Sequence, residues 1–305
     1  MILRRALLSI LPSIIPLGNT SPQPITIPLT LLPTSGLLVS RGLSLDGAPV
    51  PTIVDTGSPF LTCASESYGG GGGGQEGGDE ESIEQYGEDF LSVKWQKARV
   101  SVSQDLGTMK VGVISAGKNN NVNRNYLGLV YKDAVRPSFL EQTPFTSFEL
   151  SYPRRTLKLS TSRANLPHPF YDFSSASSNA YFYATPLRSI TVNGSPLTPP
   201  PGRPLVAVVD SGLSGLIVDE DCRRLLLPGC NLNRTDRIDL NLPNGDVWRV
   251  RRESFLEVET YELPWFDRDG GGERQRPLVV ALGAAYLFDG TLRVCTETKT
   301  FDVTF

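Results

Sequence analysis

The chain has 305 residues, 29 of them basic and 32 acidic, which gives a formal net charge of −3. A mildly acidic chain lacks the basic surface that a phosphate backbone requires, so nucleic acid is excluded as a partner. The single histidine, His168, stands between two prolines, where we expect a loop. Zinc and iron sites with several histidines are therefore excluded. We expect any catalysis to depend on carboxylates, with no metal or cofactor.

Residues 1–20 have the composition of a secretory signal peptide. Arg4 and Arg5 precede the apolar run Ala6–Leu17, and small polar residues follow it. The run is too short to span a bilayer comfortably, and no other segment is as apolar over a comparable length. The sequence therefore predicts a secreted protein without a membrane anchor.

Most of the remaining chain alternates between short β-type runs and turn residues, which 29 glycines and 24 prolines favour. The clearest runs are Leu37–Ser40, Arg99–Ser103, Lys110–Ile114, Thr156–Leu159 and Ser189–Val192. Helical periodicity is limited to the neighbourhoods of residues 137–142 and 221–227. Six consecutive glycines at 69–74 predict a surface loop.

The length suits two globular units, at about 150 residues each. A segment rich in proline and serine at residues 166–179 is the expected boundary. We therefore place an N-terminal lobe at residues 25–165, a connector at 166–179 and a C-terminal lobe at 180–305.

An internal repeat decides the interpretation. An apolar strand ends in Asp-Thr-Gly at Asp55, and a second one ends in Asp-Ser-Gly at Asp210. Gly128 lies 73 residues after Asp55, and Gly283 lies 73 residues after Asp210. Each of these glycines follows two apolar-type residues. One such motif is a weak signal, because Asp and Gly commonly close turns. Two copies with matching downstream glycines indicate a duplicated lobe.

Two aspartates at the tips of equivalent turns, one from each lobe, can lie side by side where the two lobes meet. Because like charges a few ångströms apart cannot both ionise, such a pair holds one proton over a range of acid pH. One carboxylate can then act as a base toward a bound water while the protonated one polarises a substrate carbonyl. The candidate catalytic residues are Asp55 and Asp210, and the expected supporting residues are Thr56, Gly57, Ser58, Ser211 and Gly212. The glycines let the backbone turn close to the carboxylates, and the hydroxyls of Thr56 and Ser211 can tie the two loops together.

These motifs resemble those of the pepsin-like aspartic endopeptidases, over most of residues 25–305. The likeness extends to the pair Tyr86-Gly87, in the place of that family's flap tyrosine, to Tyr126–Tyr131, and to Phe148–Ser151, in the place of the segment that enters the interlobe sheet. The resemblance implies an all-β, bilobal fold whose two β-barrel-like lobes flank a central cleft. It also implies an endopeptidase that hydrolyses peptide bonds of protein or peptide substrates at acid pH, with Tyr86 and Gly87 in a substrate-binding flap. We expect a monomer.

Some residues depart from that family's pattern. Leu213 replaces the Ser or Thr that usually follows the second motif, Thr62 stands where a tryptophan usually backs the flap tyrosine, and the bulky, acidic residues 88–91 follow the flap pair. These departures keep a second hypothesis open, namely a catalytically weak or inactive protein of the same fold that acts as a binding or inhibitor module. A glycosidase with two carboxylates on a β scaffold is a third hypothesis, although its chemistry does not need the glycine-bearing turns.

The chain has four cysteines, Cys63, Cys222, Cys230 and Cys295. An even number in a secreted chain permits two disulfides. Cys222 and Cys230 bracket a short helical stretch, and we predict a disulfide between them. The alternative is four buried, free thiols.

Overall fold

The computed structural model describes residues 22–68, 80–86, 89–117, 125–131, 136–171, 183–226, 237–251, 258–260 and 277–305. The predicted signal segment and the glycine run at 69–74 lie outside these ranges. Within them, no helix has both the length and the apolar character that crossing a membrane requires.

The strands are β1 (Ile25–Leu31), β2 (Leu38–Ser40), β3 (Ser44–Leu45), β4 (Ala48–Pro49), β5 (Thr52–Asp55), β6 (Leu61–Ala64), β7 (Glu80–Tyr86), β8 (Asp89–Ser101), β9 (Asp105–Gly117), β10 (Tyr126–Gly128), β11 (Ser147–Ser151), β12 (Thr156–Ser160), β13 (His168–Pro169), β14 (Ala184–Leu187), β15 (Ser189–Val192), β16 (Ser195–Leu197), β17 (Leu205–Val209), β18 (Leu216–Val218), β19 (Arg237–Asn241), β20 (Val247–Arg251), β21 (Val258–Thr260), β22 (Leu278–Leu282), β23 (Thr291–Cys295) and β24 (Thr300–Thr304). The helices are the 3₁₀ helix η1 (Leu140–Gln142), α1 (Glu220–Leu226) and α2 (Ala284–Leu287). The described chain is mostly β, as its composition predicts.

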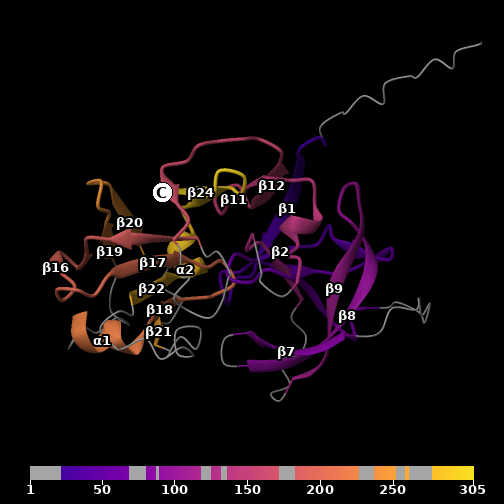
Figure 1. The fold of residues 1–305 in the computed structure, drawn as a ribbon, viewed down its shortest axis with the longest axis horizontal. Coiled ribbons are helices and arrows are strands. Elements are labelled where there is room, and N and C mark those ends of the chain that lie inside the picture. The colour runs from indigo at the N-terminus through magenta and orange to yellow at the C-terminus, as the bar shows by residue number, and fades with distance from the viewer. Residues whose placement is uncertain are drawn as a thin grey trace, which may run out of the picture.

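The strands form three sheets (Figure 1). The largest has the order β13-β24-β23-β11-β12-β1-β2-β5-β10-β6-β9-β8-β3-β4, with β7 paired to β8. The second has the order β14-β17-β22-β18-β21, and the third has the order β16-β15-β19-β20.

The internal repeat of the sequence appears as a repeated strand arrangement. In the first half, β5 pairs antiparallel with β2 and parallel with β10, and β6 pairs antiparallel with β10 and parallel with β9. In the second half, β17, β14, β22, β18 and β21 repeat the same order and the same directions. The two aspartates therefore leave equivalent strands of two equivalent sheets.

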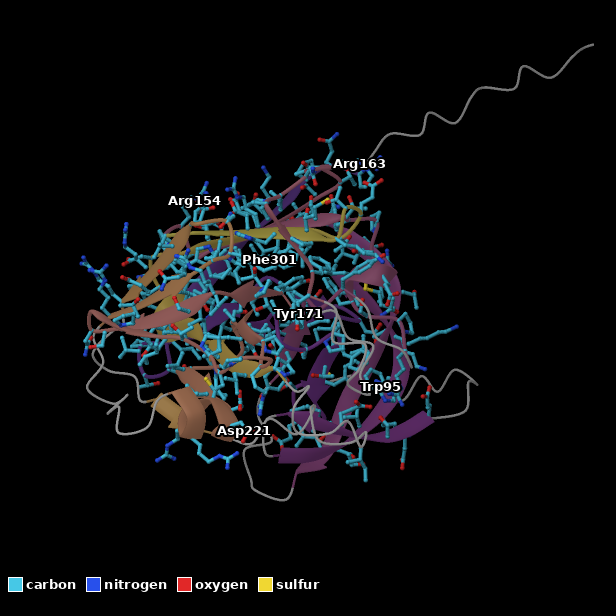
Figure 2. The ribbon with its side chains drawn as sticks, turned by 60° about the vertical axis from the view of Figure 1, so that its left-hand side comes forward. Trp95, Arg154, Arg163, Tyr171, Asp221 and Phe301 are labelled. Carbon is cyan, nitrogen blue, oxygen red and sulfur yellow. The ribbon has the colours of Figure 1, made fainter. Side chains whose placement is uncertain are left out.

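The two halves are joined by a layer that contains strands from both. β11 pairs on one side with β12 and on the other with β23 from the C-terminal end of the chain. In Figure 1 this layer lies above the purple N-terminal and orange C-terminal halves. Phe301 of β24 lies in the same layer, above Trp95 of one half and Asp221 of the other in the view of Figure 2. The Tyr183 hydroxyl donates a hydrogen bond to the backbone carbonyl of Leu129, a further link between the halves.

Burial follows the position of each strand in its sheet. β1 alternates between buried and exposed residues, as expected of a strand with one face toward solvent. All residues of β5, β17 and β22 are buried, as expected for strands covered on both faces. A separate small cluster, formed by Phe60, Leu91, Val93, Trp95 and Ile114, lies beneath the β7–β8 hairpin.

His168 is not in a loop, as the sequence analysis expected. It forms the short strand β13, pairs with Phe301 of β24, and is only 6% exposed. Its ring makes an edge contact with Trp248 at 5.2 Å between centroids. Burial lowers the pKa of His168 and so favours its neutral form. β24 covers this segment in the folded protein, although the prolines on either side of His168 predict a connector.

The predicted disulfide between Cys222 and Cys230 is wrong. Cys222 is a free thiol on α1, fully buried in the main apolar core, and burial raises its pKa. Cys63 and Cys295 are also free and buried. Three of the four cysteines are therefore unpaired, and an intrachain disulfide needs two. Cys230 lies outside the described residues. The physical reason is that Cys222 packs inward as a small apolar residue.

Candidate active site

Asp55 and Asp210 occupy the same local structure in the two halves. Asp55 is the last residue of β5, and Asp210 directly follows β17. The amide of Gly57 donates to Asp55 Oδ1 at 2.8 Å, and the amide of Gly212 donates to Asp210 Oδ1 at 2.9 Å. The carboxyl groups also hydrogen-bond to each other, and the residues are only 6% and 5% exposed. The structure thus brings the two candidate catalytic residues together.

Reciprocal hydrogen bonds between Thr56 and Ser211 hold the two turns together. The Thr56 amide donates to Ser211 Oγ at 3.1 Å, and the Ser211 amide donates to Thr56 Oγ1 at 2.9 Å. Each hydroxyl then donates to the carbonyl before the opposite aspartate, Thr56 Oγ1 to Val209 and Ser211 Oγ to Val54. All four groups are buried, so this pattern fixes the relative position of the aspartate turns. The sequence analysis predicted this role for the two hydroxyls.

The glycines of the two motifs are required by their neighbours in the opposite half. A Cβ on Gly57 would lie 2.2 Å from Asp210 Oδ2, and a Cβ on Gly212 would lie 2.3 Å from Asp55 Oδ1. Real Cβ atoms do not approach other atoms this closely. Each glycine therefore leaves the space that the opposite carboxyl group occupies.

The downstream glycines sit where a second strand passes the aspartate turn. Gly128 of β10 lies opposite Asp55 in parallel register, and Gly283 directly follows the β22 residue whose carbonyl accepts from the Asp210 amide. A Cβ would lie 2.4 Å from the Phe60 amide at Gly128 and 2.1 Å from the Gly215 carbonyl at Gly283. The equal spacing in sequence thus reflects the same strand crossing in both halves.

The electrostatic environment favours one shared proton. Burial raises the pKa of Asp55, and the Gly57 amide and the neighbouring Ser58 hydroxyl lower it in part. Burial also raises the pKa of Asp210, and the charge of Asp55 raises it further, well above its ordinary value. The two carboxyl groups therefore share one proton, and burial raises the pKa of both.

The asymmetry of the pair has a source in the sequence. Ser58 follows the first motif, whereas Leu213 occupies the equivalent place after the second and has no hydroxyl. Its backbone amide lowers the pKa of Asp210, but its side chain packs against a small apolar cluster of the C-terminal half. Leu213 thus leaves Asp210 without the neighbouring hydroxyl that Asp55 has in Ser58.

The sequence analysis missed Tyr152. This residue follows β11 and is buried, and its pKa is raised by burial and then by the charges of Asp210 and Asp55. No motif marks it, because only the packing of the β11 layer against the two halves brings it near the carboxyl groups.

The predicted flap lies on the β7–β8 hairpin. Tyr86 is the last residue of β7 and pairs with Asp89 of β8. The side chain of Tyr86 and all of Gly87 lie outside the described residues, so their role remains a prediction from the resemblance.

Comparison with solved structures shows the fold. The chain is similar to the aspartic proteinase from Irpex lacteus, with a TM-score of 0.60 and 14% sequence identity over 92% of this chain and 97% of that one. No protein-family model matches the sequence, and no curated protein matches it either. The predicted fold class, an all-β, pepsin-like aspartic protease fold, is confirmed.

Proposed function

We propose that this chain is an aspartic-type endopeptidase that hydrolyses peptide bonds at acid pH with Asp55 and Asp210. The observation that carries the proposal is the pair of buried, mutually hydrogen-bonded carboxyl groups, each on an Asp-x-Gly turn and each in contact with the other half's glycine. The fold is one in which this chemistry occurs.

In the proposed mechanism the two aspartates have different roles. Asp55 carries the negative charge and takes a proton from a water bound between the carboxyl groups. The protonated Asp210 donates a hydrogen bond to the substrate carbonyl and polarises it toward attack. The oxygen of the water bonds to the carbonyl carbon, and the proton held by Asp55 then passes to the leaving amine as the C–N bond breaks. Because both residues are buried, these electrostatic interactions are stronger than in water.

The protonation states set the expected pH range. Activity requires Asp55 to be ionised and Asp210 to be protonated, so the rate falls below the lower pKa of the pair and above the upper one. Burial raises both. We therefore expect a bell-shaped profile at acid pH.

We also propose that the protein is secreted through residues 1–20 and acts as a monomer on protein or peptide substrates. The apolar run after Arg4 and Arg5 supports secretion. Expression in a secretory host, with N-terminal sequencing of the product and measurement of its mass in solution, tests both points.

The test of the activity is cleavage of a mixed peptide library between about pH 3 and about pH 7, with and without the aspartic-peptidase inhibitor pepstatin. The test variants are Asp55→Asn and Asp210→Asn. Asp105→Asn is the matched control, because Asp105 also accepts a hydrogen bond from the amide of the glycine two residues later, at 3.0 Å, in an exposed turn. We expect acid-dependent cleavage that pepstatin blocks, that both test variants lose, and that the control keeps.

Leu213 supports the second hypothesis, a binding or inhibitor module with the same fold. Its apolar side chain removes a hydroxyl that would otherwise stand beside Asp210. A folded protein that cleaves nothing at any pH would favour this hypothesis over the endopeptidase.

A further inference from the structure

β8 is held in the large sheet by its pairing with β9, and Trp95 of β8 adds a side-chain link to β7. This residue of β8 is 3% exposed and belongs to the small cluster beneath the hairpin rather than to the main core. Its indole Nε1 donates to Ser82 Oγ of β7 at 2.7 Å, and Ser82 Oγ in turn donates to Glu84 Oε1 at 2.6 Å. Glu80, Ser82 and Glu84 are alternate residues of β7, so they share one face of the strand.

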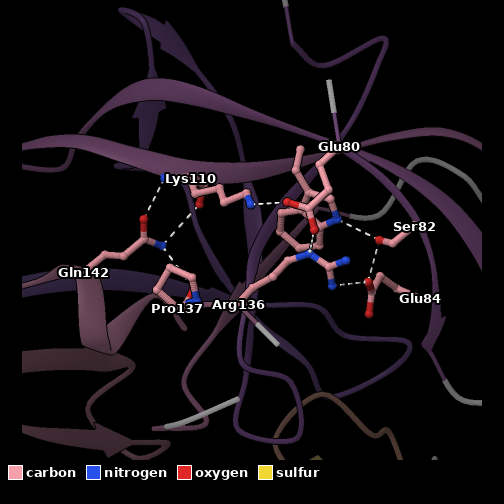
Figure 3. Close-up of polar contacts among 8 residues, drawn as sticks. Glu80, Ser82, Glu84, Lys110, Arg136, Pro137 and Gln142 are labelled. Atoms are coloured by element: carbon pink, nitrogen blue, oxygen red, sulfur yellow. Dashed lines mark hydrogen bonds and ion pairs between the residues drawn. The ribbon is translucent and has the colours of Figure 1, made fainter. Parts of the chain in front are cut away.

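Arg136 links this face of β7 to the body of the protein (Figure 3). Its Nε lies 2.9 Å from Glu80 Oε1, and its Nη1 lies 2.8 Å from Glu84 Oε1. Its guanidinium carbon lies 4.7 Å from the centroid of the Trp95 ring, a cation–π contact. Lys110 of β9 makes a further ion pair with Glu80. The Arg136 side chain is only 10% exposed, so these contacts are partly desolvated.

The backbone after Arg136 is tied to the loop that follows Asp55. The Phe139 amide donates to the Pro59 carbonyl at 2.8 Å. Gln142 of η1 accepts from the Lys110 amide at 2.6 Å and donates to the Pro137 carbonyl at 3.3 Å. Arg136 therefore extends from a segment whose position is set by the Asp55 loop.

The same loop reaches the hairpin by a second contact. Phe60, in the Asp55 loop, meets the Trp95 ring edge-on at 4.9 Å between centroids. A continuous series of side-chain contacts thus connects the Asp55 loop to β7, through Phe60, Trp95 and Arg136. Tyr86, the predicted flap residue, is two positions beyond Glu84 in the same strand.

We propose that Arg136 is a positioning residue for the peptidase reaction, which sets the place of the β7–β8 hairpin relative to Asp55. This inference rests on the proposed function. Arg136 acts through Glu80, Glu84 and Trp95 rather than on the substrate itself. Its planar guanidinium binds two carboxylates and a ring face at once, which a lysine ammonium cannot reproduce.

The contacts are suited to acid conditions. The pKa of Glu80 is lowered, first by Lys110 and then by Arg136. The Glu80 carboxylate therefore stays ionised further into the acid range than an unperturbed glutamate would. Its ion pairs with Lys110 and Arg136 therefore persist into that range.

The test compares Arg136→Met, Arg136→Lys and Glu84→Gln with the matched control Arg99→Met. Arg99 is 70% exposed and pairs with Asp105 at the far end of the β8–β9 hairpin. For cleavage of one library-derived peptide, we expect Arg136→Met to raise KM about tenfold while kcat changes less than about twofold. Arg136→Lys and Glu84→Gln should raise KM by smaller factors, and Arg99→Met should leave it unchanged. A merely structural role would reduce the folded fraction, and so the apparent kcat, without this change in KM.

Amide hydrogen exchange of β7, measured by mass spectrometry on the same proteins, separates this inference from the proposed function. We expect faster exchange in β7, and not in β11, for Arg136→Met and Glu84→Gln. A wild-type protein that cleaves nothing refutes the proposed function, and the exchange rates still decide whether Arg136 holds β7. Unchanged exchange in β7, or an unchanged KM in an active enzyme, would overturn the positioning role of Arg136.

Discussion

Thr56 and Ser211 exchange backbone-to-hydroxyl hydrogen bonds of 3.1 and 2.9 Å across the boundary between the two halves of the chain. Each residue directly follows one of the paired aspartates. The distance between the two carboxyl groups is therefore set by side chains that are themselves buried and immobilised by hydrogen bonds, which is the arrangement that a preorganised site needs.

Replacing Thr56 by Val should destabilise the protein. The variant keeps the shape of the side chain but leaves the Ser211 amide and the Val209 carbonyl without their partner, at a cost of about 1–3 kcal/mol for each buried group. We expect the free energy of unfolding in denaturant to fall by about 2–6 kcal/mol. Thr56→Ser keeps the hydroxyl and should stay within about 1 kcal/mol of the wild type. Thr26→Val, on the exposed face of β1, is the control, and an equal loss there would contradict the assigned role.

Gly57→Ala should abolish most activity. The new methyl group would lie 2.2 Å from Asp210 Oδ2, so the carboxyl groups must separate. Because a displacement of about 1 Å at reacting groups can cost about a hundredfold in rate, we expect at least that loss in kcat/KM. Gly42→Ala is the matched control, since no atom lies within 4 Å of a Cβ at that position. A variant at Gly57 with full activity would contradict the close approach of the two turns.

Asp210→Asn should raise stability at neutral pH. The pKa of Asp210 is well above its ordinary value in the folded protein, so the native state binds more protons than the unfolded chain between the unfolded and folded pKa values. Stability contributed by this group is thus present in acid and falls as pH rises through that window. The amide cannot ionise, and we expect Tm to exceed that of the wild type by about 3 °C or more at pH 7. Thermal unfolding should show this difference shrinking toward about pH 3, and a constant difference would be the contrary result.

Leu213→Ser and Ser58→Ala should move opposite limbs of the pH–rate profile. A hydroxyl beside Asp210 stabilises its ionised form and lowers its pKa, so the basic limb moves to lower pH. Removing the Ser58 hydroxyl takes away a group that lowers the pKa of Asp55, so the acid limb moves to higher pH. Measurement of kcat/KM against pH for both variants decides the point. Shifts of the two limbs in the same direction would contradict the assignment of the proton to Asp210.

Reducing agent should leave the Tm unchanged. Cys63, Cys222 and Cys295 are free thiols, whereas loss of a native disulfide typically costs about 2–5 kcal/mol. Thermal unfolding with and without dithiothreitol tests this, and titration of thiols in the denatured, unreduced protein gives an independent count. A lower Tm after reduction would restore the disulfide hypothesis.

The sequence alone predicted the fold class and the two aspartates. An Asp-x-Gly turn after an apolar strand is a local pattern, readable from adjacent residues, and its repetition with equal spacing to Gly128 and Gly283 implies the same strand crossing twice. The hydroxyls of Thr56 and Ser211 could be assigned for the same reason, since the repeat places them at equivalent positions. The roles of Tyr86 and Gly87 came from the resemblance and stay predictions.

Other features depended on which strands pair, which no local pattern specifies. Arg136 and Glu84 are 52 residues apart in the chain, and Trp95 meets Phe60 only because β8 lies over the Asp55 loop. His168 is buried because β24 covers it, and Cys222 is free because α1 turns it into the core. The sequence by itself determined the groups that could share a proton, because the chemistry restricts those residue types. Only the tertiary structure decided that the two aspartates lie buried against each other and what holds the hairpin near them, because burial and long-range contacts arise when the sheets assemble.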